Sequence, residues 1–310
     1  MNKEILPGKM SYEEFTDEVL ITIKKLYPDC EVGIREMTKN NQVKLQGLHI
    51  RPEDVNFVAI LYLEPFYELY EQGMPMDGII SVILKNYEAN SPKKKIDFQF
   101  FKDFEQVRDR IVYRLINTEM NRELLEDVPH INYWDLSICF SYAFQSDEFG
   151  DGMVLLHHSH LESWNVDCKE LMKLAEENTP RLFPATFCDM NEILGQKTEE
   201  LFPDAGMELR EDRKLYVLSN EKQQYGAAAM LYPGMLSDIA DRLQKDFFII
   251  PSSIFEVLIL PVDENPDKEK VTGRLHSIIE SVNLTELNGE EILSYEPFYY
   301  SYGKKELTKV

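Results

Sequence analysis

The chain has 310 residues, of which 44 % are apolar and 28 % are charged, as is typical of a folded globular protein. Its 55 acidic and 33 basic residues give a formal charge of −22, which opposes binding to nucleic-acid phosphates and to anionic membranes. We therefore expect neither a nucleic-acid partner nor a membrane. The only basic run, Lys93 to Lys95, is typical of a solvated turn.

Cysteine usage and the N-terminal segment indicate the compartment. The four cysteines are far apart and form no CxxC pair, so we interpret them as buried free thiols in a reducing compartment: Cys30, Cys139, Cys168 and Cys188. The segment "MNKEILPGKMSYEEF" has no hydrophobic signal core, and no apolar run approaches the roughly 18 residues of a membrane span. We expect a soluble, cytoplasmic protein.

The first 92 residues predict a block with the order α-β-β-β-α-α. Apolar residues recur at helical spacing after Ser11, which forms a capping box with Glu14. Two strands around a turn at Asn40-Asn41 follow, then a strand that becomes a helix near Pro65, and a helix within "MPMDGIISVILKNYEAN". The segment "ANSPKKK" is the predicted linker.

Residues 96–310 predict a larger α+β domain. Three strand-like segments come first, the last two as a hairpin around "QSDEFGDG": "RDRIVYRLINTE", "YWDLSICFSYAF" and "GMVLLHHSHLESW". A helix over "VDCKELMKLAEEN" follows. The two prolines of "TPRLFP" predict extended chain, and a short helix at 190–194 precedes a charged loop through Arg213.

The order strand-strand-helix then occurs again. It appears at about 134–178 and at about 214–244, where "KLYVLSN" and "YGAAAMLYP" predict a hairpin before a helix that opens at Pro233. Whether this is a true duplication stays open. Two strands, a helix and a final strand close the chain: "FFIIP", "FEVLILP", "DKEKVTGRLHSIIESVN" and "EPFYYSY". Hairpins of this kind favour an α+β fold with mixed or antiparallel sheets.

The corner "PSSIFEV" is the first candidate site. Ser253 and Glu256 have the spacing of a capping box, which explains both residues as scaffold. The alternative is a catalytic serine, but no histidine lies nearby in sequence and the G-x-S-x-G pattern is absent. We favour the scaffold interpretation and keep Ser253 and Glu256 as weak catalytic candidates.

The segment "HHSHLESW" is the second candidate. On a strand, His158, His160 and Glu162 would share one face and resemble a partial metal site. A spacing of two is no strong zinc signature, so exposed or hydrogen-bonded imidazoles are the preferred alternative. The glycine-rich phosphate-binding motifs are also absent. We expect no metal and no cofactor.

The aromatic runs "EPFYELY" and "EPFYYSY" allow two interpretations. Tyrosine and phenylalanine are favoured at protein interfaces, but both runs also suit core and edge-strand packing. A flat apolar patch near Tyr299 would support the interface interpretation.

Four long segments carry a resemblance over nearly the whole chain: "ILYLEPFYELYEQG", "LMKLAEENTPRLFPA", "LYVLSNEKQQYGAAAMLYPG" and "DFFIIPSSIFEVLILP". They resemble the uncharacterised domain-of-unknown-function family 5688 of anaerobic gut bacteria. The resemblance implies no activity. The pattern of the family has His before the glutamate of the Pro-Ser-Ser corner, where this chain has Phe255, which weakens a catalytic interpretation.

Two classes of function follow. We favour a binding or accessory protein that holds a protein partner through aromatic and acidic surface. The alternative is a hydrolase or metal-dependent enzyme whose site is assembled from distant residues, with Ser253 and Glu256 or with His158, His160 and Glu162.

Overall fold

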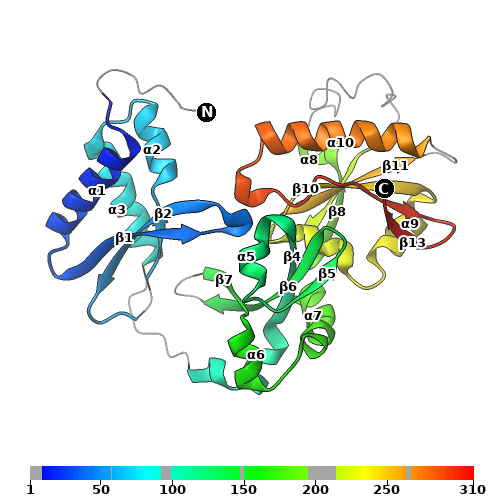
Figure 1. The fold of residues 1–310 in the computed structure, drawn as a ribbon, viewed down its shortest axis with the longest axis horizontal. Coiled ribbons are helices and arrows are strands. Elements are labelled where there is room, and N and C mark those ends of the chain that lie inside the picture. The colour runs from blue at the N-terminus through cyan, green and yellow to red at the C-terminus, as the bar shows by residue number, and fades with distance from the viewer. Residues whose placement is uncertain (1–8, 57, 92–98, 147–149, 195–213, 263–266) are drawn as a thin grey trace. The chain divides into compact units, whose positions relative to one another are not determined.

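The structure, a computed structural model, describes residues 9–56, 58–91, 99–146, 150–194, 214–262 and 267–310 (Figure 1). The chain divides into two units. The first contains Met1–Lys39, Val43–Phe100 and Gln145–Asp151, and the second contains Asn40–Gln42, Phe101–Phe144 and Gly152–Val310. The predicted linker lysines Lys93 to Lys95 lie outside the described residues.

In its described residues, the first unit combines three α-helices with a three-stranded antiparallel sheet in the order β1-β2-β3. Its elements are α1 (Tyr12–Leu26), β1 (Cys30–Thr38), β2 (Lys44–Pro52), β3 (Leu61–Tyr62), α2 (Glu64–Glu71) and α3 (Met76–Asn90). The predicted capping box is confirmed, since the N–H of Glu14 donates to Ser11 Oγ and the N–H of Ser11 donates to the Glu14 carboxylate. Phe15 and Val19 of α1 share one core with Leu48 of β2.

The second unit begins with a four-stranded antiparallel sheet in which β6 lies between β4 and β5 and also pairs with β7. Its elements are α4 (Phe104–Val107), β4 (Ile111–Asn117), α5 (Arg122–Leu125), β5 (His130–Tyr133), β6 (Leu136–Ser146), β7 (Gly150–Leu155), α6 (His158–Trp164) and α7 (Cys168–Leu182). The end of α7 is fixed to β4, because Asn178 Nδ2 donates to the carbonyl of Ile111 and the N–H of Tyr113 donates to Thr179 Oγ1.

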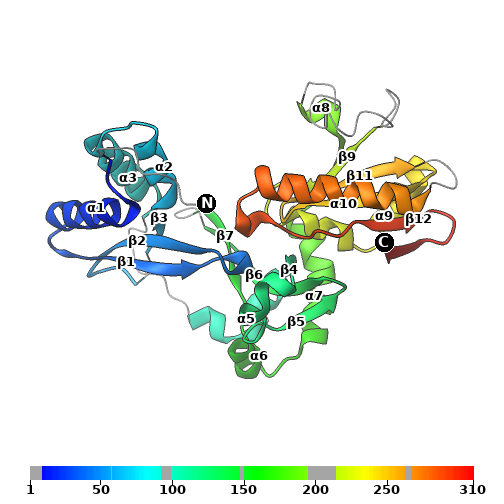
Figure 2. The ribbon, with the colours of Figure 1, turned by 45° about the horizontal axis from the view of Figure 1, so that its top comes forward.

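A six-stranded sheet in the order β13-β12-β10-β11-β9-β8 completes the second unit. Its elements are β8 (Ala185–Asp189), α8 (Met190–Leu194), β9 (Tyr216–Asn220), α9 (Met235–Leu243), β10 (Asp246–Ser253), β11 (Glu256–Val262), α10 (Lys268–Thr285), β12 (Phe298–Ser301) and β13 (Glu306–Lys309). The helix α10 runs along one face of this sheet, where Leu275 and Ile279 pack on Phe248 and Leu258 (Figure 2).

Helices with antiparallel sheets confirm the predicted α+β class. No helix in the described ranges is both long and apolar enough to cross a membrane. The charged loop predicted up to Arg213 and the centre of the "QSDEFGDG" turn, residues 147–149, lie outside the described residues.

The strand predicted over "YGAAAMLYP" is wrong. Residues Gly226–Leu231 form a 3₁₀ helix, so β9 is followed by a 3₁₀ helix and then by α9. A Cβ on Gly226 would lie only 2.2 Å from Ser219 Oγ and 2.3 Å from the carbonyl oxygen of Phe255. This tight packing of small residues, rather than alternation of side chains, determines the local structure.

Three further predictions need correction. The part of "TPRLFP" up to Leu182 is helical and not extended, because α7 continues through Pro180. The side chains of Asn178 and Thr179 in this part of α7 are hydrogen-bonded to β4. The "YWDLSICFSYAF" segment is broken by a turn at Trp134-Asp135 between β5 and β6. Of the four free cysteines only Cys139 is buried, and the other three are partly exposed.

Candidate functional site

The predicted metal-site residues lie on a helix, not on a strand. The strand β7 ends at Leu155, and α6 buries Leu161 and Trp164, three residues apart, before Asn165 ends it in the left-handed conformation. His158 and Glu162 are therefore one turn apart on one face, and His160 is separated from them. The predicted shared face of His158, His160 and Glu162 is wrong.

His160 belongs to a different set of contacts. Its Nδ1 accepts a hydrogen bond from the N–H of His157 at 2.9 Å, and its ring stacks on Trp164. The Nδ1 of His157 lies 2.7 Å from a carboxylate oxygen of Asp127. Burial, followed by the neighbouring His157, lowers the pKa of His160, so its imidazole is neutral at physiological pH.

An open hollow of about 630 Å³ lies beside α6 and is lined by His158, Glu162 and Cys168, among others. Burial, with the nearby Asp167, raises the pKa of the Cys168 thiol, which opposes formation of a reactive thiolate. Within the described ranges no three His, Cys, Asp or Glu side chains meet in a metal-binding arrangement. The hollow brings the predicted residues His158 and Glu162 together, but the nearby Cys168 is not activated as a nucleophile.

The "PSSIFEV" corner is a β-hairpin turn. Ser253 pairs with Glu256 across β10 and β11, and Ile254 and Phe255 form the two-residue connection. The capping-box prediction is therefore wrong in its geometry, because no helix begins here. Ser253 Oγ instead accepts a hydrogen bond from the N–H of Phe255 at 3.1 Å, a local turn contact of the kind that serine hydroxyls often make.

The backbone of the corner is bonded to its surroundings on several sides. The N–H of Ile254 donates to the carbonyl of Glu291 at 2.9 Å, and the N–H of Ala227 donates to the carbonyl of Ile254. Ser219 Oγ donates to the carbonyl of Phe255 at 2.7 Å. These bonds join β9, the 3₁₀ helix and the loop after α10, which supports the scaffold interpretation of Ser253.

Removing the Ser253 hydroxyl should cost about 1 kcal/mol of unfolding free energy, because the N–H of Phe255 loses its acceptor.

Glu256→Gln should lower the unfolding free energy less than Ser253→Ala does. Burial raises the pKa of Glu256, so its contribution to stability is greatest at low pH and is lost as pH rises through the folded-state pKa. Burying the charged carboxylate of Glu256 costs free energy at neutral pH, and the uncharged glutamine avoids that cost. Melting curves of both variants test this, and an unchanged or raised melting temperature for Ser253→Ala would contradict it.

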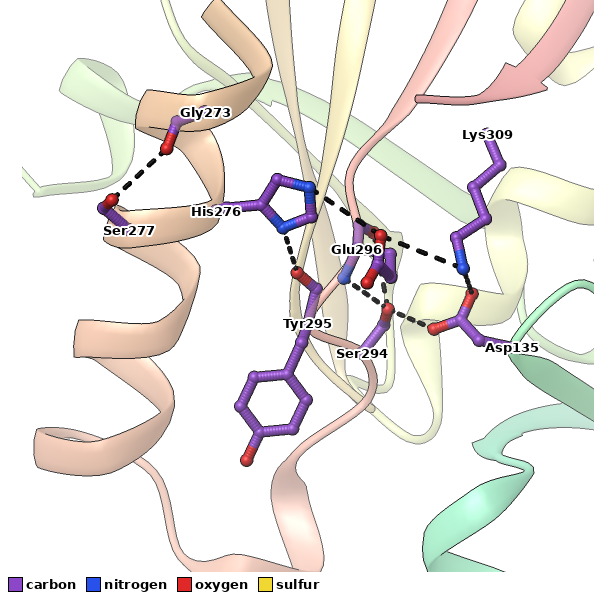
Figure 3. Close-up of polar contacts among 8 residues, drawn as sticks. All are labelled: Asp135, Gly273, His276, Ser277, Ser294, Tyr295, Glu296 and Lys309. Atoms are coloured by element: carbon purple, nitrogen blue, oxygen red, sulfur yellow. Dashed lines mark hydrogen bonds and ion pairs between the residues drawn. The ribbon is translucent and has the colours of Figure 1, made fainter.

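A cluster of polar side chains lies where the β5–β6 turn meets the segment before β12 (Figure 3). Ser294 Oγ donates to Asp135 Oδ2 at 2.5 Å and accepts from the N–H of Glu296 at 2.9 Å. Lys309 Nζ lies 3.8 Å from Asp135 and 3.8 Å from Glu296. His276 of α10 has Nε2 3.7 Å from the Glu296 carboxylate.

Trp134 stands beside this cluster in a conformation that costs energy. It has φ 55° in the two-residue turn between Tyr133 and Leu136, and Asp135 has no positive φ. This is the pattern of a type II′ turn, whose first central position favours glycine. A bulky residue at positive φ costs on the order of 1–3 kcal/mol and often marks a functional position.

Trp134 is 44 % exposed as a whole residue although its ring packs on the buried Phe298, with ring centroids 5.2 Å apart. Phe298 is the cross-strand partner of Lys309, so both side chains lie on the same face of the six-stranded sheet. Trp134 and Lys309 are therefore both neighbours of Phe298. Tyr295, next to Ser294, is 37 % exposed, and its ring points away from Lys309 (Figure 3).

We define the Trp134 patch as the exposed or partly exposed residues Trp134, Asp135, His276, Tyr295, Glu296 and Lys309 together with the buried Ser294.

The family model described as "Family of unknown function (DUF5688)" matches residues 12–302. The chain belongs to this family. No curated protein and no solved structure matches the chain significantly. Membership of DUF5688 confirms the resemblance found in the sequence and carries no activity with it.

The sequence interpretation missed most of the Trp134 patch. It assigned Trp134 and Asp135 to a strand and gave His276 no role. The usable signal was Trp-Asp at the junction of two apolar strand segments, where turn residues such as Asn-Gly are expected. The run "EPFYYSY" allowed an interface or core packing, and Tyr299 is almost fully buried, which agrees with core packing. Trp134, which packs on Phe298, is exposed.

Proposed function

We propose that this DUF5688 protein is a non-catalytic binding or accessory protein that holds another protein at the Trp134 patch. The observation that carries the proposal is Trp134 itself, a large aromatic side chain kept half exposed by a turn that favours glycine. Neither its packing on Phe298 nor the turn requires such exposure. A binding role for the indole explains why the conformational cost is retained.

The composition of the patch supports the proposal. Tryptophan and tyrosine dominate the binding energy of many interfaces, where polar residues surround the aromatic anchors. Here Trp134 and Tyr295 are attached to Asp135 and Ser294, the two residues joined by the 2.5 Å hydrogen bond. This side-chain hydrogen bond ties the two segments together, which reduces the conformational entropy that the patch itself loses on binding.

The alternative of a hydrolase or metal-dependent enzyme has less support. Ser253 is bonded to its own turn, and Glu256 has Ser252 as its hydrogen-bond partner. His158 and Glu162 line a hollow without His160. These positions do not provide a nucleophile with an adjacent base.

Site-specific photocrosslinking tests the proposal. A photoreactive amino acid at Tyr295 should give a discrete crosslinked protein in extracts of the source cells, and Trp134→Gly should remove that product. Glycine suits the turn, so this variant should keep the fold while losing the indole. The control position is Ile21 on α1, which is 48 % exposed in the first unit.

The captured protein must then bind the purified chain in isolation, with Trp134→Gly at least about tenfold weaker, as for loss of an interface anchor. Identical crosslinks from positions 21 and 295, or full binding by Trp134→Gly with an unchanged melting temperature, would contradict the proposed function.

A further inference from the structure

Lys309 is held between two carboxylates without a hydrogen bond to either. Its Nζ lies 3.8 Å from Asp135 Oδ1 and 3.8 Å from Glu296 Oε2, beyond the usual 2.7–3.2 Å range. Figure 3 shows the ammonium group at the end of an extended side chain that reaches both carboxylates. The lysine compensates the charge of both carboxylates but donates a hydrogen bond to neither.

Asp135 is the carboxylate with unused capacity. Its Oδ2 accepts the hydrogen bond from Ser294, whereas its Oδ1 is shielded from solvent and has no hydrogen-bond partner among the described residues. A carboxylate oxygen in this state lacks the donor that would offset its lost hydration. The nearby ammonium group supplies charge alone, so a better donor would be favoured in its place.

We infer that the Trp134 patch recognises an arginine side chain of its protein partner, which replaces Lys309 between Asp135 and Glu296 and stacks on Trp134. The inference rests on the proposed function and names the chemistry of the partner. It follows from three features of one surface: two carboxylates, an exposed indole and a resident cation at long distance from both acids.

Arginine fits these features better than lysine. Its planar guanidinium carries five N–H donors, enough to reach Asp135 Oδ1 and Glu296 together, and its flat face stacks on an indole. A second lysine would repeat the point charge that Lys309 already provides. Anionic groups are disfavoured by the two carboxylates and by the formal charge of −22.

The neighbours of the carboxylates keep them in place for such a ligand. Ser294 holds Asp135 by its hydroxyl and Glu296 by accepting the Glu296 N–H. His276 is oriented by its Nδ1 contact of 3.0 Å with the carbonyl of Tyr295, which leaves Nε2 facing Glu296. The exposed stem of Lys309 can move outward, because its side chain is 36 % exposed.

The two tryptophans of the chain provide the readout. Trp134 is exposed in the patch, whereas the Nε1–H of the buried Trp164 donates to the carbonyl of Phe101 at 2.9 Å. The indole N–H signals of the ¹⁵N-labelled full chain would be followed during titration with a blocked Gly-Gly-Arg-Gly-Gly peptide. The same peptide with citrulline, which has nearly the same shape and no charge, is the matched control.

We expect the Trp134 signal to shift and saturate with the arginine peptide while the Trp164 signal stays constant. The citrulline peptide should bind at least about fivefold more weakly, because it lacks the charge-assisted contacts. Asp135→Asn should weaken arginine binding by a similar factor. Lys309→Met should strengthen it about threefold or more, because the competing cation is removed while an apolar stem remains.

Charge-matched controls separate the site from the overall charge. Glu13→Gln and Lys25→Met lie on α1 and change the net charge as Asp135→Asn and Lys309→Met do. Equal binding of both peptides, weaker binding by Lys309→Met, or equal effects of the site and control variants would overturn the inference. If crosslinking at Tyr295 still requires Trp134 while the arginine peptide fails, the proposed function stands and only the arginine inference falls.

Discussion

Replacing Gly226 by alanine should destabilise the second unit by about 2 kcal/mol or more, as expected for overpacking against atoms that cannot move freely. The added Cβ would lie 2.2 Å from Ser219 Oγ, 2.3 Å from the carbonyl oxygen of Phe255 and 3.0 Å from the backbone nitrogen of Asn220. Two of these atoms are backbone. Ser219 is also fixed, because its hydroxyl donates to the same Phe255 carbonyl.

The measurement is unfolding in urea followed by tryptophan fluorescence. Both tryptophans, Trp134 and Trp164, lie in the second unit, so the signal reports the unit that contains Gly226. Gly303→Ala is the matched control, because a Cβ at that position would meet nothing within 4 Å. Equal midpoints for the two variants would show that the 3₁₀ helix can move away from the hairpin turn, contrary to the expectation.

The pattern of apolar residues correctly predicted the helices and strands whose structure depends on burying one face or both faces in the core. The helix α1 repeats Phe15, Val19 and Ile23 on one face, and all three are fully buried. The strands β10 and β11 contain the apolar runs 247–250 and 257–260 and were predicted as strands. In these segments packing against the hydrophobic core determines the secondary structure, so the pattern of apolar residues is sufficient to predict it.

The pattern failed where contacts distant in sequence decide the structure. Gly226–Leu231 is a 3₁₀ helix because Gly226 packs on Phe255, 29 positions further along the chain. The helix α7 passes through Pro180 while Thr179 is bonded to β4. Neither contact leaves a periodic signal.

The candidate site was unpredictable for the same reason. Its members come from the β5–β6 turn, α10, the segment before β12 and β13, and they meet only in the folded second unit. The sequence predicted an aromatic and acidic interaction surface in general terms. The positive φ of Trp134 is a property of the folded backbone that the residue type does not indicate.

A second large loss of stability is expected for Asn121→Ala, about 3–5 kcal/mol of unfolding free energy. The Asn121 side chain is fully buried and makes three hydrogen bonds of 2.8 Å. Its Oδ1 accepts from the N–H of Asn41, and its Nδ2 donates to Asn41 Oδ1 and to the carbonyl of Asn117. Alanine leaves these partners buried and unsatisfied.

The position of Asn41 increases the expected effect. Asn41 has φ 58°, and its amide also donates to the carbonyls of Gly289 and Ile292 at 2.8 and 2.7 Å. The pairing with Asn121 keeps the Asn41 side chain aligned for these contacts. Loss of Asn121 should therefore loosen the loop at Gly289–Glu291 as well as the end of β4.

Urea unfolding monitored by tryptophan fluorescence decides the outcome, with Asn288→Ala as the control. Asn288 is exposed, and its side chain reaches only Glu291 at 3.2 Å, so its loss should cost about 1 kcal/mol or less, as for other caps. Asn121→Asp retains the acceptor but removes the amide donor. A buried carboxylate is costly, so this variant should be least stable at neutral pH and should regain stability as pH falls and the carboxyl group takes up a proton. If Asn121→Ala lost no more stability than Asn288→Ala, the buried amide pair could not be a principal support of the second unit.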